Sequence, residues 1–533
     1  MQIAGQTLPG IAPLVLPVMR RLGLAARVDG LIPKVWDNGI TRGQAAEVLV
    51  ACILQWDSPL ALSRVKDTVS ELGLDVVLGV KSEQLHDDKL GEMLDALVPV
   101  DKEGQLDLQH VQRLEQGCAD EAIRWLGLAP QVVLFDFTHL RLSGAYRHSQ
   151  LARHGRRSGA HKQLQIGLNV LAGVGLPVAS QVYPGNANQT VNVPANLARL
   201  QERLPGRRLT VVTDSAGLCY ENILAYERAG MGFISPKQLT PAEEARMRSY
   251  APAEFVPLEY EPESGGRFWG LETIWELRWQ KHPERLTLRV LIVQSSQLRR
   301  QEQQQLLRRV RQLRDRLQAI RGYLNRNRYY HADYARRQLD HALAASEAGR
   351  FVRYQLRGES GALTLDWTLD YAALRHHLRR LGRYVLFTNR SPAEYSAAGL
   401  LETFKSQHQV EANFRQLKSE LQVAPVFLKK ENRIVALAAL YVLALMVLAV
   451  LQFLARQAGL QTPRGRAITA RELLLSYGGW AGVAVTTPDQ RYILPNAATE
   501  RQRAYLAALA FPPPEHWIPQ HHRRPEHARI PGT

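Results

Sequence analysis

Cysteine is scarce in this sequence. Its 533 residues include three cysteines, Cys52, Cys118 and Cys219, which lie far apart and form no Cys-x-x-Cys pair. This spacing argues against a disulfide framework and against a cysteine-based zinc site, and it fits a reducing compartment. No signal peptide is expected either, because no basic residue precedes the apolar stretch within residues 1–21.

Acidic residues are fewer than basic ones. The chain has 67 Lys and Arg against 50 Asp and Glu, which gives a formal net charge of +17. A surplus of this size is typical of a protein that binds a large anion, most often nucleic acid. Hydrophobic residues at 45% and charged residues at 22% exclude a disordered or fibrous chain. The length predicts two to four domains.

Long hydrophobic runs are absent, with one exception. Residues 434–455 are uncharged and long enough to span a bilayer. However, the run is rich in alanine, contains Gln452, and belongs to a polar, basic chain. A helix that is apolar on all sides also suits the centre of a large core. We therefore expect a buried core helix, and a membrane protein anchored by this run is the alternative.

Hydrophobic periodicity predicts an α/β protein in five regions. Strand-like runs that first follow one another and then alternate with helices indicate a mixed sheet. The predicted regions are a helical N-terminal part at 1–125, a mixed α/β part at 126–250, a part of different composition at 251–385, a mainly helical part at 386–460, and a partly structured C-terminal tail at 461–533.

Lysine is missing from an arginine-rich segment within residues 251–385. Between Arg299 and Arg357 there are fifteen arginines and five acids, a surplus of ten positive charges. Apolar residues in this segment step by four and three, from Leu306 to Leu324, which predicts a helical hairpin with a heptad seam. A solvated coiled-coil face is one interpretation, but such faces normally mix Glu with Lys. The arginine excess favours contact with phosphate groups.

Acids are also absent from residues 137–201, between two isolated aspartates. Asp136 interrupts an apolar strand, where a carboxylate is costly unless a cation neutralises it, and Asp214 ends a second apolar strand. The acid-free stretch carries a set of basic residues, Arg141, Arg147, Arg153, Arg156, Arg157 and Lys162. Carboxylates for Mg²⁺ within a basic frame suit a metal-dependent phosphodiester enzyme. For each aspartate alone, a cap or turn role is the alternative.

A third acid lies on a predicted helix, residues 401–421. Glu411, Arg415 and Lys418 step by four and three, so they share one face of that helix. A surface ion pair between Glu411 and Arg415 is the simpler interpretation. The functional interpretation places Glu411 on the metal and Lys418 on a phosphate.

These segments resemble a known family. Asp136 in LFDFT, Asp214 in VVTDSAG and Glu411 in VEANFRQLKSEL resemble the three catalytic segments of bacterial insertion-sequence DDE transposases. The resemblance is to the group with a large insertion before the glutamate and a Tyr-x2-Arg-x3-Glu-x6-Lys signature. Here that spacing gives Phe404, Gln407, Glu411 and Lys418, so the Glu and Lys match and the other two do not. Further matches, HDDKLGEMLDAL, GAHKQLQIGLNV and LPVASQVYPGNANQT, extend the resemblance over about residues 20–455.

The resemblance implies a fold, cofactors and partners. The fold is an RNase H-like mixed sheet whose core has a first part at 126–250 and its completion at 386–460. Between them lies an insertion domain of strands and a helical hairpin at 251–385, and a helical domain at 1–125 that binds DNA ends precedes the core. Asp136, Asp214 and Glu411 hold two Mg²⁺ ions, for which Mn²⁺ can substitute. The partners are double-stranded DNA with terminal inverted repeats, target DNA and a second copy in a homodimer on DNA, with no membrane, in the bacterial cytoplasm at the nucleoid.

The DNA-binding candidates are basic or aromatic. They are Lys418, Arg415, Lys162, Arg156 and Arg157 for phosphates and, for stacking on a flipped base, Trp269, Trp275 or Trp279. Base stacking contributes about 1–3 kcal/mol, although sheet packing explains at least two of these tryptophans better. The enzyme is predicted to cut and join transposon ends. The alternatives are an RNase H-like structure-selective nuclease without strand transfer and a domesticated DNA-binding protein that no longer cuts.

Overall fold

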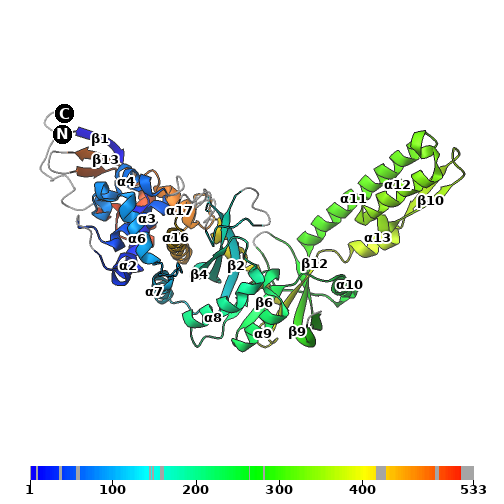
Figure 1. Cartoon of the computed structure of the whole chain (residues 1–533), viewed down its shortest axis with the longest axis horizontal. Helices are drawn as coiled ribbons and strands as arrows, with labels where there is room; N and C mark the ends of the chain where they lie inside the picture. The colour runs from blue at the N-terminus through cyan, green and yellow to red at the C-terminus, as the bar shows by residue number, and fades with distance from the viewer. Residues whose placement is uncertain are drawn as a thin grey trace. The chain divides into compact units, whose positions relative to one another are not determined.

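The structure is a computed structural model in which the chain forms two compact units (Figure 1). Unit 1 comprises residues 1–213, 221–231 and 406–533, and unit 2 comprises residues 214–220 and 232–405. The structure describes residues 2–7, 10–34, 39–55, 61–142, 146, 149–155, 161–262, 265–279, 282–415, 428–486 and 491–517.

The N-terminal part of unit 1 is helical, as predicted. Its helices are α1 Ala12–Arg21, α2 Leu24–Leu31, α3 Arg42–Leu54, α4 Leu62–Glu71, α5 Leu74–Leu78, α6 Asp87–Leu97 and α7 Gln109–Trp125. Helix α3 begins with a capping box, because Thr41 Oγ1 accepts from the backbone N–H of Gln44 at 3.1 Å while Gln44 Oε1 accepts from that of Thr41 at 2.9 Å. This reciprocal pair fixes the start of a helix whose residues are almost all buried.

The apolar run forms the central helix of unit 1, α16 Glu431–Gln457. Among the described residues it is the one helix long and apolar enough to cross a membrane, and its 18-residue apolar window is fully buried. Helices α1, α3, α6, α7 and α17 (Ala470–Tyr477) and strand β4 (Leu176–Pro184) lie against it. At its start, Arg433 donates to both carboxylate oxygens of Asp95 at 2.8 and 2.7 Å. The prediction of a core helix agrees with this burial.

A mixed sheet stands beside α16 in unit 1. Its strand order is β4, β3 (Gln163–Leu171), β2 (Val132–Arg141) and β5 (Thr210–Val212). The pairs β4–β3 and β3–β2 are antiparallel, and β2–β5 is parallel with Leu134 beside Val212. Helices α7 and α8 (Val193–Arg203) contact β4. The predicted mixed α/β sheet is therefore confirmed at this level.

The C-terminal segment, predicted as a partly structured tail, contributes regular elements to unit 1. After α17 come β13 Gly482–Thr486, β14 Arg491–Pro495 and α18 Glu500–Ala508. Strand β1 (Gln2–Thr7) pairs antiparallel with β13, so the first strand of the chain joins a sheet built by its end. Pairing over such a sequence separation leaves little trace in local composition.

Unit 2 is built on an antiparallel sheet that carries a long arm. The strand order is β6 (Gly232–Pro236), β12 (Arg383–Thr388), β9 (His282–Ser295), β8 (Phe268–Trp279) and β7 (Val256–Pro257). Outside the arm, unit 2 contains the helices α10 Pro241–Ser249, α13 Tyr371–Leu378 and α14 Ala397–Lys405. Helix α9 (Tyr220–Arg228) begins at the last residue of the first segment of unit 2 and continues in unit 1.

The arm, residues 296–369, extends from this sheet (Figure 1). It consists of α11 Ser296–Tyr323, α12 Ala332–Ala344 and the hairpin of β10 Val352–Arg357 with β11 Thr364–Leu369. Leu313, Leu317 and Ile320 of α11 pack with Ala335 and Leu339 of α12. These contacts are those of the predicted heptad seam, and the helical hairpin is present.

The predicted single helix at 401–421 is two helices. Helix α14 ends at Lys405, and α15 His408–Arg415 follows in unit 1. Helical hydrogen bonding restarts at the junction, where Gln407 O accepts from the backbone N–H of Glu411 at 3.3 Å. The chain passes from one unit to the other here, so the two helices belong to different cores although the sequence period continues. Residues 416–427, which include the rest of the predicted helix with Lys418, lie outside the described residues.

Candidate functional site

Asp136 lies in the middle of β2, opposite Leu168 of β3. Its side chain is half-buried, and Oδ1 accepts from the backbone N–H of Phe137 at 2.7 Å. The rings of Phe135 and Phe137 flank it in sequence and meet edge to face, with centroids 4.8 Å apart. Successive side chains of a strand point to opposite faces, so the two rings pack on one face of β2 and Asp136 lies on the other.

Asp214 follows β5 at the first position of unit 2. Val212 pairs with Leu134. Asp136 lies two residues after Leu134 within β2, and Asp214 lies two residues after Val212, just past the end of β5. The backbone of Asp214 is held in a turn, because its carbonyl accepts from Ser235 Oγ at 2.9 Å and from the N–H of Gly217 at 3.1 Å. Its side chain is half-buried.

Glu411 lies on α15, which packs against β2 and β3. The helix that carries Glu411 therefore rests on the strand that carries Asp136. Gln409 fixes the start of α15, since its Oε1 accepts from the backbone N–H of Gly173 at 2.8 Å, in the turn after β3. Glu411 and Arg415 are both exposed.

The basic candidates are only partly described. Lys162 is half-buried just before β3, and its Nζ donates to the carbonyl of Tyr146 at 2.6 Å. Tyr146 in turn donates its hydroxyl to the carbonyl of Leu428 at 2.7 Å. Lys162 therefore binds the backbone carbonyl of Tyr146, and its phosphate contact stays a prediction. Arg156, Arg157 and Lys418 lie outside the described residues.

The three tryptophan candidates have different environments in unit 2. Trp269 is half-buried, with the guanidinium of Arg299 at 5.9 Å from its ring. Trp279 packs edge to face with Tyr220 at 5.7 Å. Trp275 is fully buried against Phe387 and has no exposed face for a base. Its role is therefore packing within the sheet, the alternative given above to base stacking.

Sequence reasoning missed Lys405, which directly follows the signature position Phe404. Its ammonium lies 5.4 Å from the ring centres of both Phe268 and Tyr384. Burial lowers the pKa of Lys405. A lysine in apolar surroundings at the end of a helix gives no local sequence signal, because the two rings come from strands distant in sequence.

The donor chemistry of the three acids fits Mg²⁺, which prefers carboxylate oxygens. Within the described ranges, no group of three His, Cys, Asp or Glu side chains is gathered closely enough to hold a metal ion. The structure thus brings the elements of Asp136 and Glu411 together but does not itself assemble a ligand cluster.

Comparison with known proteins gives distant matches. Residues 7–106, which contain α1–α6, match a family described as "Domain of unknown function (DUF4277)". No curated protein matches the sequence. The chain is similar to the piggyBac transposase in its synaptic complex with hairpin DNA, at 7% identity over 89% of this chain and 82% of that chain, with a TM-score of 0.42. It is also similar to the Mos1 transposase in a paired-end complex, at 12% identity over 42% of this chain and 62% of that chain, with a TM-score of 0.15. Likeness at these values carries no conclusion about activity.

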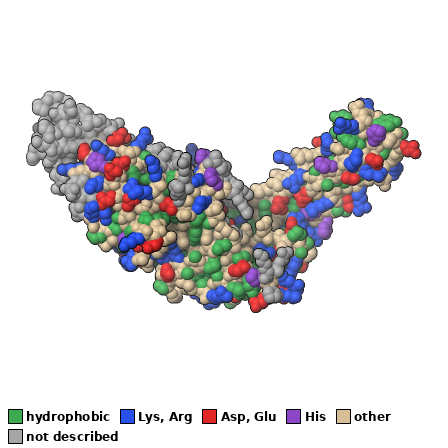
Figure 2. Space-filling model, in the orientation of Figure 1, with side chains coloured by type: hydrophobic (Ala, Val, Ile, Leu, Met, Phe, Trp, Pro, Cys, Tyr) green, Lys and Arg blue, Asp and Glu red, His purple; other side chains and the backbone are tan. Residues whose placement is uncertain are grey.

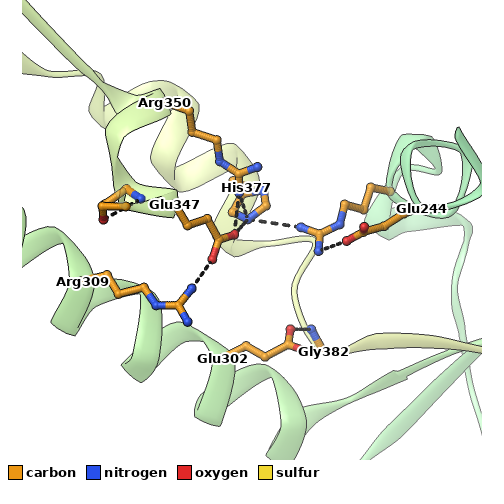
Figure 3. Close-up of polar contacts among 10 residues, drawn as sticks. Glu244, Glu302, Arg309, Glu347, Arg350, His377 and Gly382 are labelled. Carbon is orange, nitrogen blue, oxygen red and sulfur yellow. Dashed lines mark hydrogen bonds and ion pairs between the residues drawn. The ribbon is translucent and has the colours of Figure 1, made fainter. Parts of the chain in front are cut away.

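A separate polar cluster lies at the base of the arm (Figure 3). His377 Nε2 accepts from Arg350 at 2.5 Å and from Arg248 at 3.2 Å, and Glu347 Oε1 lies 3.8 Å from it. Burial, with the positive charges of Arg350 and Arg248, lowers the pKa of His377 to about 4. Because Nε2 accepts from two arginines, it carries no proton and the imidazole ring is neutral. A lowered pKa of His377 agrees with a neutral ring.

This cluster predicts a pH-dependent stability. His377 has a pKa of about 4 in the fold and about 6.5 in an unfolded chain, so the unfolded state binds more protons between these values. Stability should therefore fall as the pH drops from about 6.5 to about 4, by at most about 1.4 kcal/mol per pH unit. The measurement is urea unfolding at pH 7 and pH 5 for the wild type and His377→Gln. An identical pH dependence in both proteins would contradict the prediction.

Proposed function

We propose that this chain is a DDE transposase that cuts and joins DNA at transposon ends. The observation that carries the proposal is the packing of α15, with Glu411, on β2, with Asp136. The parallel register of β2 and β5 supports the inclusion of Asp214, because it follows Val212 as Asp136 follows Leu134. Three acids in this order, one in a strand, one just after a strand and one on a later helix, also match the family segments described above.

In this proposal Asp136, Asp214 and Glu411 hold two Mg²⁺ ions within an RNase H-like core. When bound, the ions activate water or a 3′-hydroxyl and stabilise the leaving oxygen of an in-line displacement. Lys162 and Arg415, with Arg156, Arg157 and Lys418, contact the DNA backbone. Trp269 and Trp279 are both half-buried and are the remaining candidates to stack on a displaced base.

The partners follow from the same proposal. They are duplex DNA with terminal inverted repeats, held in part by the helical domain of residues 1–125, and a target duplex. The active form is a homodimer on DNA, and the site of action is the bacterial cytoplasm at the nucleoid. The burial of α16 in unit 1 supports a partner list without a membrane.

The experiment is cleavage of a duplex that carries the inverted repeats flanking the coding region. We expect Mg²⁺-dependent nicking at the repeat ends, joining of the free 3′ ends to a target plasmid, and neither reaction in EDTA. Binding with no cleavage in Mg²⁺ or Mn²⁺ would replace the proposal by the domesticated DNA-binding protein. Cleavage without joining would replace it by the structure-selective nuclease.

A further inference from the structure

The positive charge of the arm is concentrated in arginines that have no acidic partner. Residues 296–369 of the arm are all described, and ten of its exposed arginines have neither a carboxylate within ion-pair distance nor a side-chain hydrogen-bond partner among the described residues. We call these the unpaired arginines: Arg300, Arg308, Arg311, Arg316, Arg321, Arg326, Arg328, Arg336, Arg337 and Arg353. Figure 2 shows Lys and Arg side chains spread over the visible face of the arm.

The acids of the arm are mostly engaged elsewhere. Glu347 binds Arg309 at 2.7 Å and Arg350 at 2.9 Å (Figure 3), and Asp315 lies 3.3 Å from Arg314. Glu302 accepts from the backbone N–H of Gly382 at 2.6 Å, and Asp340 accepts from the hydroxyl of Tyr354 at 2.5 Å. These contacts divide the arginines into a paired and an unpaired set.

The unpaired arginines follow the length of α11, mostly on a side that its core does not use. With 3.6 residues per turn, Arg300, Arg308 and Arg311 fall on the side of α11 away from Leu313 and Leu317. Arg321 lies one turn after Leu317, at the edge of the core side. The 28 residues of α11 span about 42 Å. The charge is therefore an extended stripe rather than a compact pocket.

The stripe continues into an ordered turn at the tip of the arm, where Arg326 and Arg328 are exposed. Asn325 pins this turn to the β10–β11 hairpin, because its Nδ2 donates to the carbonyl of Leu363 at 2.9 Å and its Oδ1 accepts from the N–H of Leu363 at 2.7 Å. Tyr323 and Tyr330 are exposed beside it, at 56% and 48%. A fixed turn holds its charges in place before a ligand arrives, which lowers the entropy cost of binding.

An extended, lysine-free stripe of guanidinium groups fits an extended polyanion with regularly spaced phosphates. A membrane surface fits less well, because Leu307, Tyr323 and Tyr330 are the only large exposed hydrophobic residues of the described arm. We propose that the arm is a separate DNA-binding surface that holds the sugar–phosphate backbone of duplex DNA through the unpaired arginines. The inference rests on the proposed function for its partner class, DNA, but uses none of the three acids.

The test compares two full-length variants that lose equal charge from the same arm. The first is Arg300→Gln, Arg308→Gln, Arg311→Gln and Arg321→Gln. The matched control is Arg309→Gln, Arg314→Gln, Arg350→Gln and Arg357→Gln, whose arginines contact Glu347, Asp315 or Gln355. Affinity for a random-sequence duplex of roughly 30 base pairs is measured in EDTA against salt. Each lost phosphate contact reduces the slope of log K against log salt by about 0.9, so we expect a reduction of about 3 to 4 for the first variant and less than about 1 for the control.

The outcomes separate the two proposals. Equal losses in both variants, or an unchanged slope in the first, would overturn the arm surface and leave the proposed function standing. A wild type with no affinity for DNA would overturn both. If the first variant loses binding to anionic phosphatidylglycerol vesicles but keeps its affinity for DNA, the arm binds a membrane surface instead. That result would also overturn the proposed DNA-binding surface. A third variant with lysine at the same four positions keeps the charge and should restore most of the slope, which excludes misfolding as the cause.

Discussion

Asp136→Ala and Glu411→Ala should each reduce strand cleavage by about a thousandfold or more while DNA affinity stays within about twofold. A bound metal ion supplies several kcal/mol of transition-state stabilisation, and each 1.36 kcal/mol corresponds to about tenfold in rate. Asp136 interrupts a largely buried strand, and Glu411 lies on the helix packed against that strand. The measurement is single-turnover nicking of the inverted-repeat duplex in Mg²⁺.

Glu402→Ala is the matched control for Glu411→Ala. Glu402 is an exposed glutamate on the preceding helix, α14. Its removal deletes one surface charge without touching the three acids, so cleavage should remain near the wild-type rate. Loss of cleavage in Glu402→Ala equal to that in Glu411→Ala would show that Glu411 acts only through surface charge or folding.

The second large effect concerns the core of unit 1. Leu445 is fully buried in α16, and truncation of a buried leucine to alanine costs about 2–5 kcal/mol through lost burial and the cavity left behind. Leu475→Ala, on α17, is the control, because that side chain is 55% exposed and surface substitutions change stability by about 0.5 kcal/mol or less. Urea unfolding of the two variants in detergent-free buffer gives the comparison.

The two interpretations of the apolar run differ in this experiment. A core helix predicts a soluble wild type and a large loss of stability in Leu445→Ala alone. A membrane anchor predicts a wild type that requires detergent and is indifferent to the truncation. A wild type that requires detergent, or a Leu445→Ala variant as stable as the wild type, would contradict the packing of α16 against five helices and a strand.

Local features of the fold could be predicted because their causes are local. The Thr41 cap depends on a side chain three residues from its partner, and the heptad seam of α11 depends on apolar spacing alone. The break after Lys405 could not be predicted, because both sides of it have the same helical period and only the separate cores distinguish them. The pairing of β1 with β13 is likewise invisible locally, since it joins the two ends of the chain.

The candidate site shows the same division. The placement of Asp136 in a strand, and of Asp214 just after one, follows from apolar neighbours that the sequence displays. The packing of α15 on β2 depends on tertiary contacts and needed the structure. The burial of Trp275 also needed it, because strict alternation would place all three tryptophans of β8 on one face, whereas the buried positions change parity between Gly270 and Trp275. Lys405 and its two aromatic neighbours gave no sequence signal at all.

Binding of Mn²⁺ to the full-length protein on DNA, followed by electron paramagnetic resonance, tests the joint action of the three acids most directly. The account predicts about two tightly bound ions per chain in the wild type, and weakened binding in each of Asp136→Ala, Asp214→Ala and Glu411→Ala. Wild-type Mn²⁺ binding in any one of these variants would contradict it, because that acid would then not share the ions with the other two.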